Sequence, residues 1–251
     1  MHRFHLPTDH CRTPQMRLVG REAHHAVHVL RLARGERVIV LDGAGQELHC
    51  EVGDARHEAV VLHVTARKEV PPLPYQITLL QALPKGRLFE DIVQKATELG
   101  VHRIVPLLTE HVVTRLDREN AEAKTAKWRQ IAVEAIKQCG NPWLPIIEAP
   151  ATPQAFVARQ ECFDLSLIAA LQGNGRHPRE AIQRFLAEHR RAPRSVSVWI
   201  GPEGDFTPAE VGLAESAGAL PITLGRLVLR VETAALYCLS FLNYELAGPQ
   251  P

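Results

Sequence analysis

Beyond residue 74 the chain alternates between strand-like and helix-like segments, and this alternation constrains the fold more than any other feature. The strand-like segments are short and rich in β-branched residues, whereas a helical segment such as 87–99 has apolar residues every three or four positions. Strands that alternate with helices form an α/β domain around a mainly parallel sheet. We expect strands at residues 76–83, 102–107, 165–171, 196–200 and 221–224, and helices at residues 87–99, 119–139, 177–189, 207–217 and 232–246.

The region before residue 74 has a different pattern, and a proline cluster, Val70-Pro71-Pro72-Leu73-Pro74, ends it. It contains short strand-like runs, and Asp42-Gly43-Ala44-Gly45 is typical of a hairpin turn between two of them. These glycines also resemble the loop of Rossmann-type methyltransferases, but their spacing is wrong and no crossover helix follows. We expect strands at residues 37–41, 48–52 and 59–65, a helix at 22–32, and two domains: a small β-barrel at residues 1–72 and the α/β domain at 74–247.

The composition is ordinary for a soluble globular protein, with 45% hydrophobic and 23% charged residues. Because the formal net charge is only +1, any surface for nucleic acid must be a local patch. We see no apolar run long enough to cross a bilayer and no signal peptide, so we expect a cytoplasmic protein without a membrane partner.

Cysteines and histidines give little sign of a metal site. The five cysteines are dispersed without a C-x-x-C pair, which argues against a disulfide framework and a zinc ribbon, and most are expected to be buried. His24, His25 and His28 have helical spacing, but no carboxylate or cysteine pair accompanies them. We therefore expect no metal.

The segment from Val196 to Glu210 combines a strand, a glycine turn and a helix start. The turn Gly201-Pro202-Glu203-Gly204 has the residues of a type I turn. Thr207 as N-cap, a proline at the first helical position and Glu210 form a complete capping box. Ligands of parallel sheets bind beyond the carboxyl ends of the strands. We therefore expect a ligand crevice here, bordered by a second loop at residues 224–234.

The familiar nucleotide and nucleophile motifs are missing. The sequence has no G-x-x-x-x-G-K-[ST] and no G-x-S-x-G, which disfavours a P-loop NTPase and a nucleophile elbow. Gly173-Asn174-Gly175 lacks the third glycine of a dinucleotide fingerprint, and no acidic residue stands at the expected offset. An NAD-type enzyme is therefore disfavoured.

Four segments resemble one known family. They are I-G-P-E-G-D-F-T-P-A-E (200–210), L-G-R-L-V-L-R-V-E-T-A-A-L (224–236), K-G-R-L-F-E-D-I-V-Q-K-A-T-E-L-G-V (85–101) and H-V-L-R-L-A-R-G-E-R-V-I-V-L-D-G-A-G (28–45). Together, in this order and over nearly the whole chain, they resemble the ribosomal small-subunit RNA methyltransferase E family of the SPOUT class. The resemblance implies a trefoil-knotted α/β domain after a PUA-like barrel. It further implies a homodimer that uses S-adenosylmethionine to methylate N3 of a uridine in 16S rRNA.

The resemblance and the residues together give the expected site. The glycines would let the backbone approach a planar ligand, and the apolar residues would form its walls. Arg230 would stabilise the uracil anion, with Glu203 and Glu232 as bases or orienting groups; alternatively, Glu232 only favours the helix N-terminus and pairs with Arg230. The expected cofactor-binding residues are Leu171, Ile200, Gly201, Pro202, Glu203, Gly204, Leu224, Gly225, Leu229 and Thr233.

The expected RNA-binding residues carry positive charge or hydrogen-bonding groups. They are Arg3, Arg21, Arg31, Arg34, Lys85, Lys137, Gln138 and Asn141. Such contacts position RNA rather than specify its sequence. Asn141 stands where the family usually has arginine, so either Lys137 compensates or this member is differently tuned. Alternatives to the main prediction are a SPOUT enzyme acting on another RNA or base and a catalytically inactive RNA-binding relative.

Overall fold

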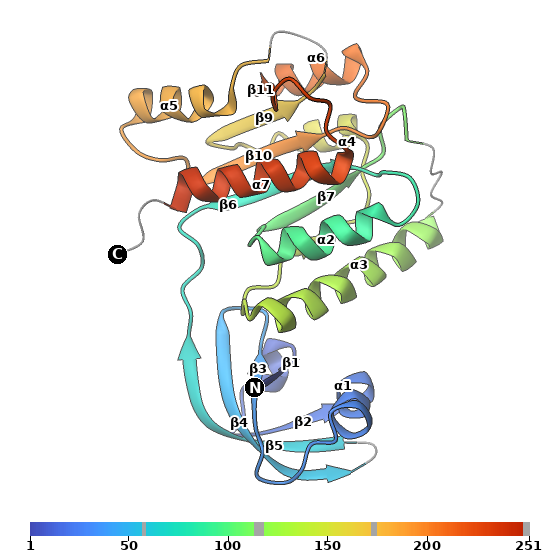
Figure 1. Ribbon diagram of the computed structural model, residues 1–251, viewed down its shortest axis with the longest axis vertical. Coiled ribbons are helices and arrows are strands. Elements are labelled where there is room, and N and C mark those ends of the chain that lie inside the picture. Colours follow the sequence, from blue (N-terminus) through green and yellow to red (C-terminus); the bar gives the residue numbers. More distant parts are fainter. Residues whose placement is uncertain (57–58, 113–117, 172–174, 248–251) are drawn as a thin grey trace. The chain divides into compact units, whose positions relative to one another are not determined.

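The structure is a computed structural model that describes residues 1–56, 59–112, 118–171 and 175–247 (Figure 1). Its contacts divide the chain into two compact units. The first comprises Met1–Pro72 with Val133–Leu144, and the second comprises Leu73–Ala132 with Pro145–Pro251. The first unit therefore contains residues 133–144 in addition to the range 1–72. The two domains predicted from the sequence, residues 1–72 and 74–247, stay a prediction.

The first unit is built on a curved five-stranded sheet with the order β1-β3-β4-β5-β2. β1 pairs with β3 in parallel, and the other neighbours are antiparallel. Phe4, Met16 and Leu18 are among its fully enclosed core residues. The elements are β1 (His2–His5), η1 (Thr8–Cys11), β2 (Gln15–Val19), α1 (Gly20–His24), η2 (His25–Val29), β3 (Arg37–Leu41), β4 (Gln46–Arg56) and β5 (Ala59–Glu69).

The hairpin turn at residues 42–45 is confirmed. β3 and β4 pair antiparallel on either side of it, and the Asp42 carboxylate accepts hydrogen bonds from the backbone N–H groups of Ala44 and Gln46, both at 2.8 Å. The single helix predicted at residues 22–32 is instead a short α-helix followed by a π-helical turn. β1 and β2 were not predicted, because four or five residues of alternating burial give little signal without their partners.

The second unit contains a six-stranded sheet with the order β11-β9-β10-β6-β7-β8, in which every pair is parallel. α2, α5 and α7 cover one face, and α4 and α6 cover the other (Figure 1). The elements are β6 (Gln76–Ala82), α2 (Leu88–Glu98), β7 (Arg103–Leu107), α3 (Arg118–Cys139, shared between the units), β8 (Ile146–Ile147), α4 (Pro153–Val157), β9 (Leu165–Ala169), α5 (Pro178–His189), β10 (Ser195–Ile200), α6 (Pro208–Ser216), β11 (Ala219–Ile222) and α7 (Val231–Ala247).

These elements confirm the predicted fold class, an α/β domain with a parallel sheet after a small PUA-like domain. The strand predicted at residues 221–224 is shifted, since β11 starts directly after Gly218, whose φ of 90° ends the preceding helix. Leu224 therefore lies in the loop after the strand. β8 and α4 were too short to predict from periodicity.

The start of α6 follows its sequence signal closely. The Thr207 hydroxyl accepts a hydrogen bond from the Glu210 N–H at 3.3 Å, and Glu210 Oε2 accepts one from the Thr207 N–H at 2.9 Å. Glu210 Oε1 accepts a further hydrogen bond at 2.9 Å from the N–H of Glu110, which follows β7. The carboxylate therefore caps α6 and fixes the β7 loop at once.

No helix among the described residues is long and apolar enough to cross a membrane. The same residues contain no group of three or more histidine, cysteine or acidic side chains arranged to hold a metal ion. Cys11, Cys50 and Cys238 are buried, as expected for most of the cysteines, whereas Cys139 and Cys162 are exposed; all five thiols are free.

Replacing Glu210 by alanine is expected to lower the free energy of unfolding by about 2–3 kcal/mol, because the buried N–H of Thr207 and the partly buried N–H of Glu110 lose their acceptor. Denaturant unfolding of the full chain measures the loss. Glu215→Ala, on the exposed side of the same helix, is the matched control and should change stability by less than about 0.5 kcal/mol. Equal effects of the two substitutions would contradict the dual role of Glu210.

Candidate functional site

A cavity of about 630 Å³ lies beyond the carboxyl ends of β9, β10 and β11, where the sequence placed the ligand crevice. Its residues come from the loops after these strands and from the first turn of α7. They are Leu88, Ala169, Ala170, Leu171, Gly175, Ile200, Gly201, Pro202, Glu203, Asp205, Ile222, Thr223, Leu224, Gly225, Arg226, Leu227, Val228, Leu229, Arg230, Val231, Glu232 and Ala234. The volume lies in the range of small-molecule sites.

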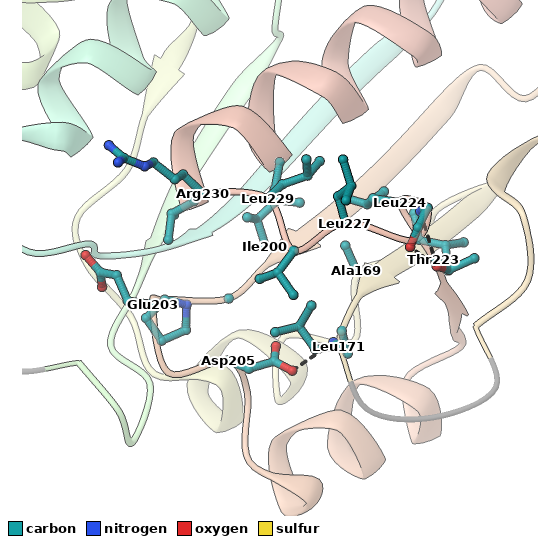
Figure 2. A pocket seen from close by; sticks show the side chains of 18 of the residues that line it. Ala169, Leu171, Ile200, Glu203, Asp205, Thr223, Leu224, Leu227, Leu229 and Arg230 are labelled. Atoms are coloured by element: carbon teal, nitrogen blue, oxygen red, sulfur yellow. Dashed lines mark hydrogen bonds between the residues drawn. The ribbon is translucent and has the colours of Figure 1, made fainter.

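The cavity has an apolar middle and differs at its two ends (Figure 2). Ala169, Ile200 and Leu229 lie between the ends. Glu203 and Arg230 lie together at one end, and Thr223 and Leu224 lie at the other (Figure 2). An apolar middle with Glu203 and Arg230 at one end suits a ligand with a planar ring and a separate reacting group.

The turn after β10 is displaced by one residue from the prediction. The N–H of Asp205 donates to the Pro202 carbonyl at 3.0 Å, so the turn spans residues 202–205 rather than 201–204. Asp205 has a φ of 59°, a left-handed conformation that aspartate tolerates better than most residues. Asp205 is 8% exposed, and its carboxylate accepts a hydrogen bond from the Leu171 N–H at 2.8 Å. This bond ties the β9 loop to the turn (Figure 2).

His111, from the loop after β7, holds the other side of the same turn. Its Nδ1 lies 2.9 Å from the Asp205 carbonyl oxygen. This hydrogen bond is the largest of several effects that raise the pKa of His111 above 6.5. A Cβ at Gly204 would lie 3.2 Å from the His111 Cβ, so glycine at this position permits the contact.

Glu203 links the turn to the loop after β6. Its Oε1 accepts a hydrogen bond from the backbone N–H of Lys85 at 2.9 Å. With the Asp205, His111 and Glu210 contacts, residues 203–210 therefore bind the loops that follow β6, β7 and β9. Of these three loops, the one after β9 contributes Ala170 and Leu171 to the cavity lining.

Most of the predicted cofactor-binding residues are brought together. Gly204 and Thr233 do not line the cavity, and all the others do: Leu171, Ile200, Gly201, Pro202, Glu203, Leu224, Gly225 and Leu229. Their contact with a cofactor stays a prediction. Gly173 and Asn174 of the glycine-rich stretch lie outside the described residues.

Glycine is required at three cavity positions for different physical reasons. Gly225 has a φ of 112° and open space at its Cβ position, so its backbone conformation requires glycine while leaving room for a ligand. A Cβ at Gly201 would lie 3.1 Å from the Asp205 carboxylate, so Gly201 is set by the turn itself. A Cβ at Gly175 would lie 2.7 Å from the Ile222 backbone.

Sequence reasoning missed Asp205, Thr223 and the exposed Leu227 as cavity residues. Asp205 stands directly after the predicted turn, so the one-residue shift of the turn hides it. Thr223 and Leu227 lie in a segment without regular structure, where periodicity carries no information.

The candidate catalytic residues lie at the charged end and at the start of α7. Arg230 is exposed, and its carbonyl accepts a hydrogen bond from the Ala234 N–H at 2.8 Å, as an N-cap residue does. Glu232 is half-buried and lines the cavity. Within the described part of the chain, no ion pair joins Arg230 to Glu232, so nothing supports the alternative that they simply neutralise each other.

Two of the predicted RNA-binding side chains are already engaged in the first unit. Lys137 Nζ is 2.8 Å from Glu22 and 3.0 Å from Glu134, and the side chain is only 7% exposed. Arg3 donates from Nη1 to the carbonyls of Lys137 and Gln138, at 3.3 and 3.1 Å. These contacts fix the end of α3 and argue against the RNA role predicted for Lys137.

The other predicted RNA-binding residues are more accessible. Arg21, Arg31, Arg34, Lys85 and Gln138 are exposed. Asn141 accepts a hydrogen bond from the Trp143 N–H at 3.0 Å, which closes a local turn. Because Lys137 is buried and paired, it does not replace the positive charge that the family's usual arginine would supply at position 141.

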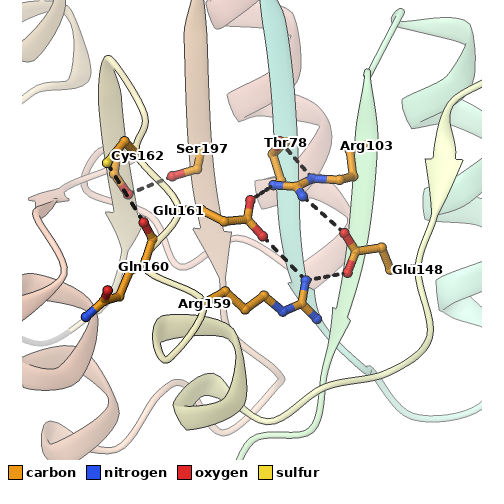
Figure 3. Close-up of polar contacts among 9 residues, drawn as sticks. Thr78, Arg103, Glu148, Arg159, Gln160, Glu161, Cys162 and Ser197 are labelled. Atoms are coloured by element: carbon orange, nitrogen blue, oxygen red, sulfur yellow. Dashed lines mark hydrogen bonds and ion pairs between the residues drawn. The ribbon is translucent and has the colours of Figure 1, made fainter.

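A second, smaller cavity of about 370 Å³ lies over the Ser166 and Ser197 side chains of β9 and β10. Beside it, Arg103 and Arg159 form a closed set of ion pairs with Glu148 and Glu161 (Figure 3). The Arg103 guanidinium lowers the pKa of Glu161 through its hydrogen bond. With these charges paired and the serine hydroxyls bonded to each other at 2.6 Å, this cavity offers few free groups for recognition.

Comparison with known proteins agrees with this geometry. The sequence model of the RNA methyltransferase domain matches residues 71–243, and that of the RNA methyltransferase PUA domain matches residues 18–65. The chain is 32% identical to the ribosomal RNA small subunit methyltransferase E of Bacillus subtilis, over 92% of this chain and 91% of the relative. It is 33% identical to the protein of the same name from Synechocystis, over 90% and 72%.

Among solved structures, a putative methyltransferase from Legionella pneumophila in complex with the cofactor SAM has a TM-score of 0.86, 31% identity and 97% coverage of both chains. A probable rRNA-methyltransferase from Porphyromonas gingivalis has a TM-score of 0.83 and 26% identity, with complete coverage. Fold and sequence thus define an RNA methyltransferase. The chain belongs to the ribosomal RNA small subunit methyltransferase E family.

His111, in the loop after β7, and His102, directly before β7, provide a titration test of the turn. The pKa of His111 is expected above 6.5, because the Asp205 carbonyl accepts its hydrogen bond. Stability from this contact is then fully present below the pKa of an unfolded histidine and is lost as pH rises through the folded pKa. The pKa of His102, lowered by burial and by the Arg103 charge, is the control. Ring-proton NMR titration that gives His111 no higher pKa than His102 would contradict the contact.

Proposed function

We propose that this protein transfers a methyl group from S-adenosylmethionine to N3 of a uridine in the 16S rRNA of the small ribosomal subunit. One observation carries the proposal. The chain, a member of this family, has a ligand-sized cavity at the carboxyl ends of three adjacent parallel strands, with Arg230 and Glu203 at one end. The relatives' names refer to small-subunit ribosomal RNA, and the similar Legionella structure holds SAM.

The cavity suits S-adenosylmethionine in size and chemistry. Ile200, Leu224 and Leu229 offer an apolar wall for the adenine ring, and the backbone of the loops around Gly201 and Gly225 supplies hydrogen-bonding groups. When bound, the cofactor supplies a methyl group whose carbon–sulfur bond breaks as the bond to the nucleobase nitrogen forms. The predicted residues that line the cavity and would hold it are Leu171, Ile200, Gly201, Pro202, Leu224, Gly225 and Leu229, together with Asp205 and Thr223.

The reaction needs groups that handle the proton on uracil N3. This proton must leave as the methyl group arrives, and negative charge then spreads to the uracil carbonyl oxygens. The Arg230 guanidinium can donate to such an oxygen and stabilise the charge. The half-buried Glu232, which lines the cavity, is our candidate for the group that accepts the proton.

The first unit would dock the RNA. Its match to the PUA domain of RNA methyltransferases supports this role, and Arg21, Arg31 and Arg34 are exposed there for phosphate contacts. Bacterial ribosomes lie in the cytoplasm, so we place the reaction there.

We also propose a homodimer and a knotted C-terminal segment. Leu227 and Val228, at the cavity mouth, are 79% and 75% exposed, and Tyr244 of α7 is 78% exposed, which supports a partner surface. Backbone hydrogen bonds of Arg176 to Pro221 and Thr223, at 3.2 and 3.0 Å, draw the segment after β9 against β11, as a threaded loop requires. Sedimentation of the pure protein tests the dimer.

Methyl transfer to ribosomal subunits tests the main proposal. Purified small subunits that lack the modification are incubated with the protein and radiolabelled S-adenosylmethionine, and nucleosides are then analysed. We expect label in 3-methyluridine. Label in another nucleoside would favour a relative acting on another base, and cofactor binding without transfer would favour an inactive RNA-binding relative in which Asn141 marks the loss.

Substitution of Arg230 tests its role. Arg230→Ala is expected to lower kcat about 100- to 1,000-fold, because the charge on the uracil oxygen loses its donor, while the affinity for S-adenosylmethionine stays within about threefold. Arg184→Ala removes an exposed arginine of α5 that does not line the cavity, and it should leave kcat unchanged. A kcat for Arg230→Ala near that of the control would remove Arg230 from the mechanism.

A further inference from the structure

We propose that Glu203 is a positioning residue, which holds the basic loop Pro84–Arg87 at the charged end of the cavity so that this loop binds the RNA backbone. The inference deepens the proposed function and rests on it. It assigns Glu203 a role different from the proton-accepting one that its position in the turn suggests.

The first support is the hydrogen bond itself. Glu203 Oε1 accepts from the backbone N–H of Lys85 at 2.9 Å, although the two residues are 118 positions apart in the sequence. The segment lies between β6 and α2 without regular structure of its own, and Gly86 has a φ of 68°. Because a loop of this kind has few internal constraints, a charge-assisted hydrogen bond from another strand end restricts it strongly.

The second support is what the loop carries. Lys85 and Arg87 flank Gly86 and are both exposed. Neither forms an ion pair with any residue that the structure describes, in contrast to Lys127, whose Nζ lies 2.5 Å from Glu90. Two unpaired cations on either side of a glycine are suited to neighbouring phosphate groups.

The third support is location. Leu88, the residue after the loop, lines the cavity, as does Glu203. Glu203 and Arg230 lie at the same end of the cavity (Figure 2). A uridine whose base reaches Arg230 would therefore bring its flanking phosphates near Lys85 and Arg87.

A positioning residue and a general base need different properties of the Glu203 side chain. Accepting a hydrogen bond from a backbone N–H requires an oxygen but no change of protonation, so glutamine can do it. Accepting the uracil proton requires a carboxylate, and glutamine cannot replace it.

The experiment compares Glu203→Gln with Glu203→Ala, using small subunits that lack the modification and, separately, a fluorescently labelled fragment of their RNA. We expect Glu203→Ala to raise KM for the subunits and Kd for the fragment about tenfold, with kcat within about threefold of wild type. Glu203→Gln should recover at least half of this loss on a logarithmic scale. A kcat reduced more than about 100-fold in both variants would overturn the proposal and make Glu203 the base.

A double-mutant cycle tests whether Glu203 acts through the loop. Lys85→Ala with Arg87→Ala is expected to raise Kd for the RNA fragment by itself, and adding Glu203→Ala should then have less than a twofold further effect. If the fold-changes in Kd caused by the loop substitutions and by Glu203→Ala multiply in the combined variant, the proposal is overturned. Circular dichroism spectra that match the wild-type spectrum show that the variants are folded.

The two proposals can fail separately. Wild-type protein that binds the RNA fragment but forms no 3-methyluridine contradicts the proposed function, while the Kd values of the variants still judge the role of Glu203. Unchanged RNA binding in Glu203→Ala, with methylation intact in wild type, overturns only the role of Glu203.

Discussion

Hydrogen bonds from residues 203–210 to the loops after three other strands are the constraint on which the site depends. Parallel strands end at one edge of the sheet, and the loops beyond that edge have no strand pairing to hold them. Glu203 binds the N–H of Lys85, Asp205 binds that of Leu171, and Glu210 binds that of Glu110. His111 adds a contact to the Asp205 carbonyl. One short segment thereby gives four strand ends a common geometry and shapes the cavity above them.

The sequence was most informative where the signal is local. The capping box of α6 and the hairpin at residues 42–45 have the predicted hydrogen bonds, because a few neighbouring residues suffice to form them. The alternation of strands and helices likewise predicted the parallel sheet, with β11 displaced and β8 and α4 too short to detect. Most of the predicted cofactor-binding residues line one cavity, because the ends of parallel strands necessarily meet there.

What the sequence could not show are contacts between residues far apart in the chain. Lys137 has the charge of an RNA-binding residue, and only its buried pairing with Glu22 and Glu134 shows it to be occupied. Asp205 became visible only when the turn proved to be one residue later than its glycines suggested. Gly204 is explained by His111, which is 93 positions earlier in the sequence and offers no local signal. The resemblance to a family indicated candidate residues for the chemistry but not these supporting contacts.

The difference between the two ends of the cavity connects the fold to the proposed reaction. The apolar middle and the backbone-rich loops suit the part of the cofactor that must be held, and the end with Arg230 and Glu203 suits the place where the base of the RNA arrives (Figure 2). The most direct test of this account is amide hydrogen exchange of the protein with and without S-adenosylmethionine. The account predicts protection concentrated in residues 169–171, 200–205 and 223–231. Protection instead around the second cavity, in residues 156–166, or none at saturating cofactor, would contradict it.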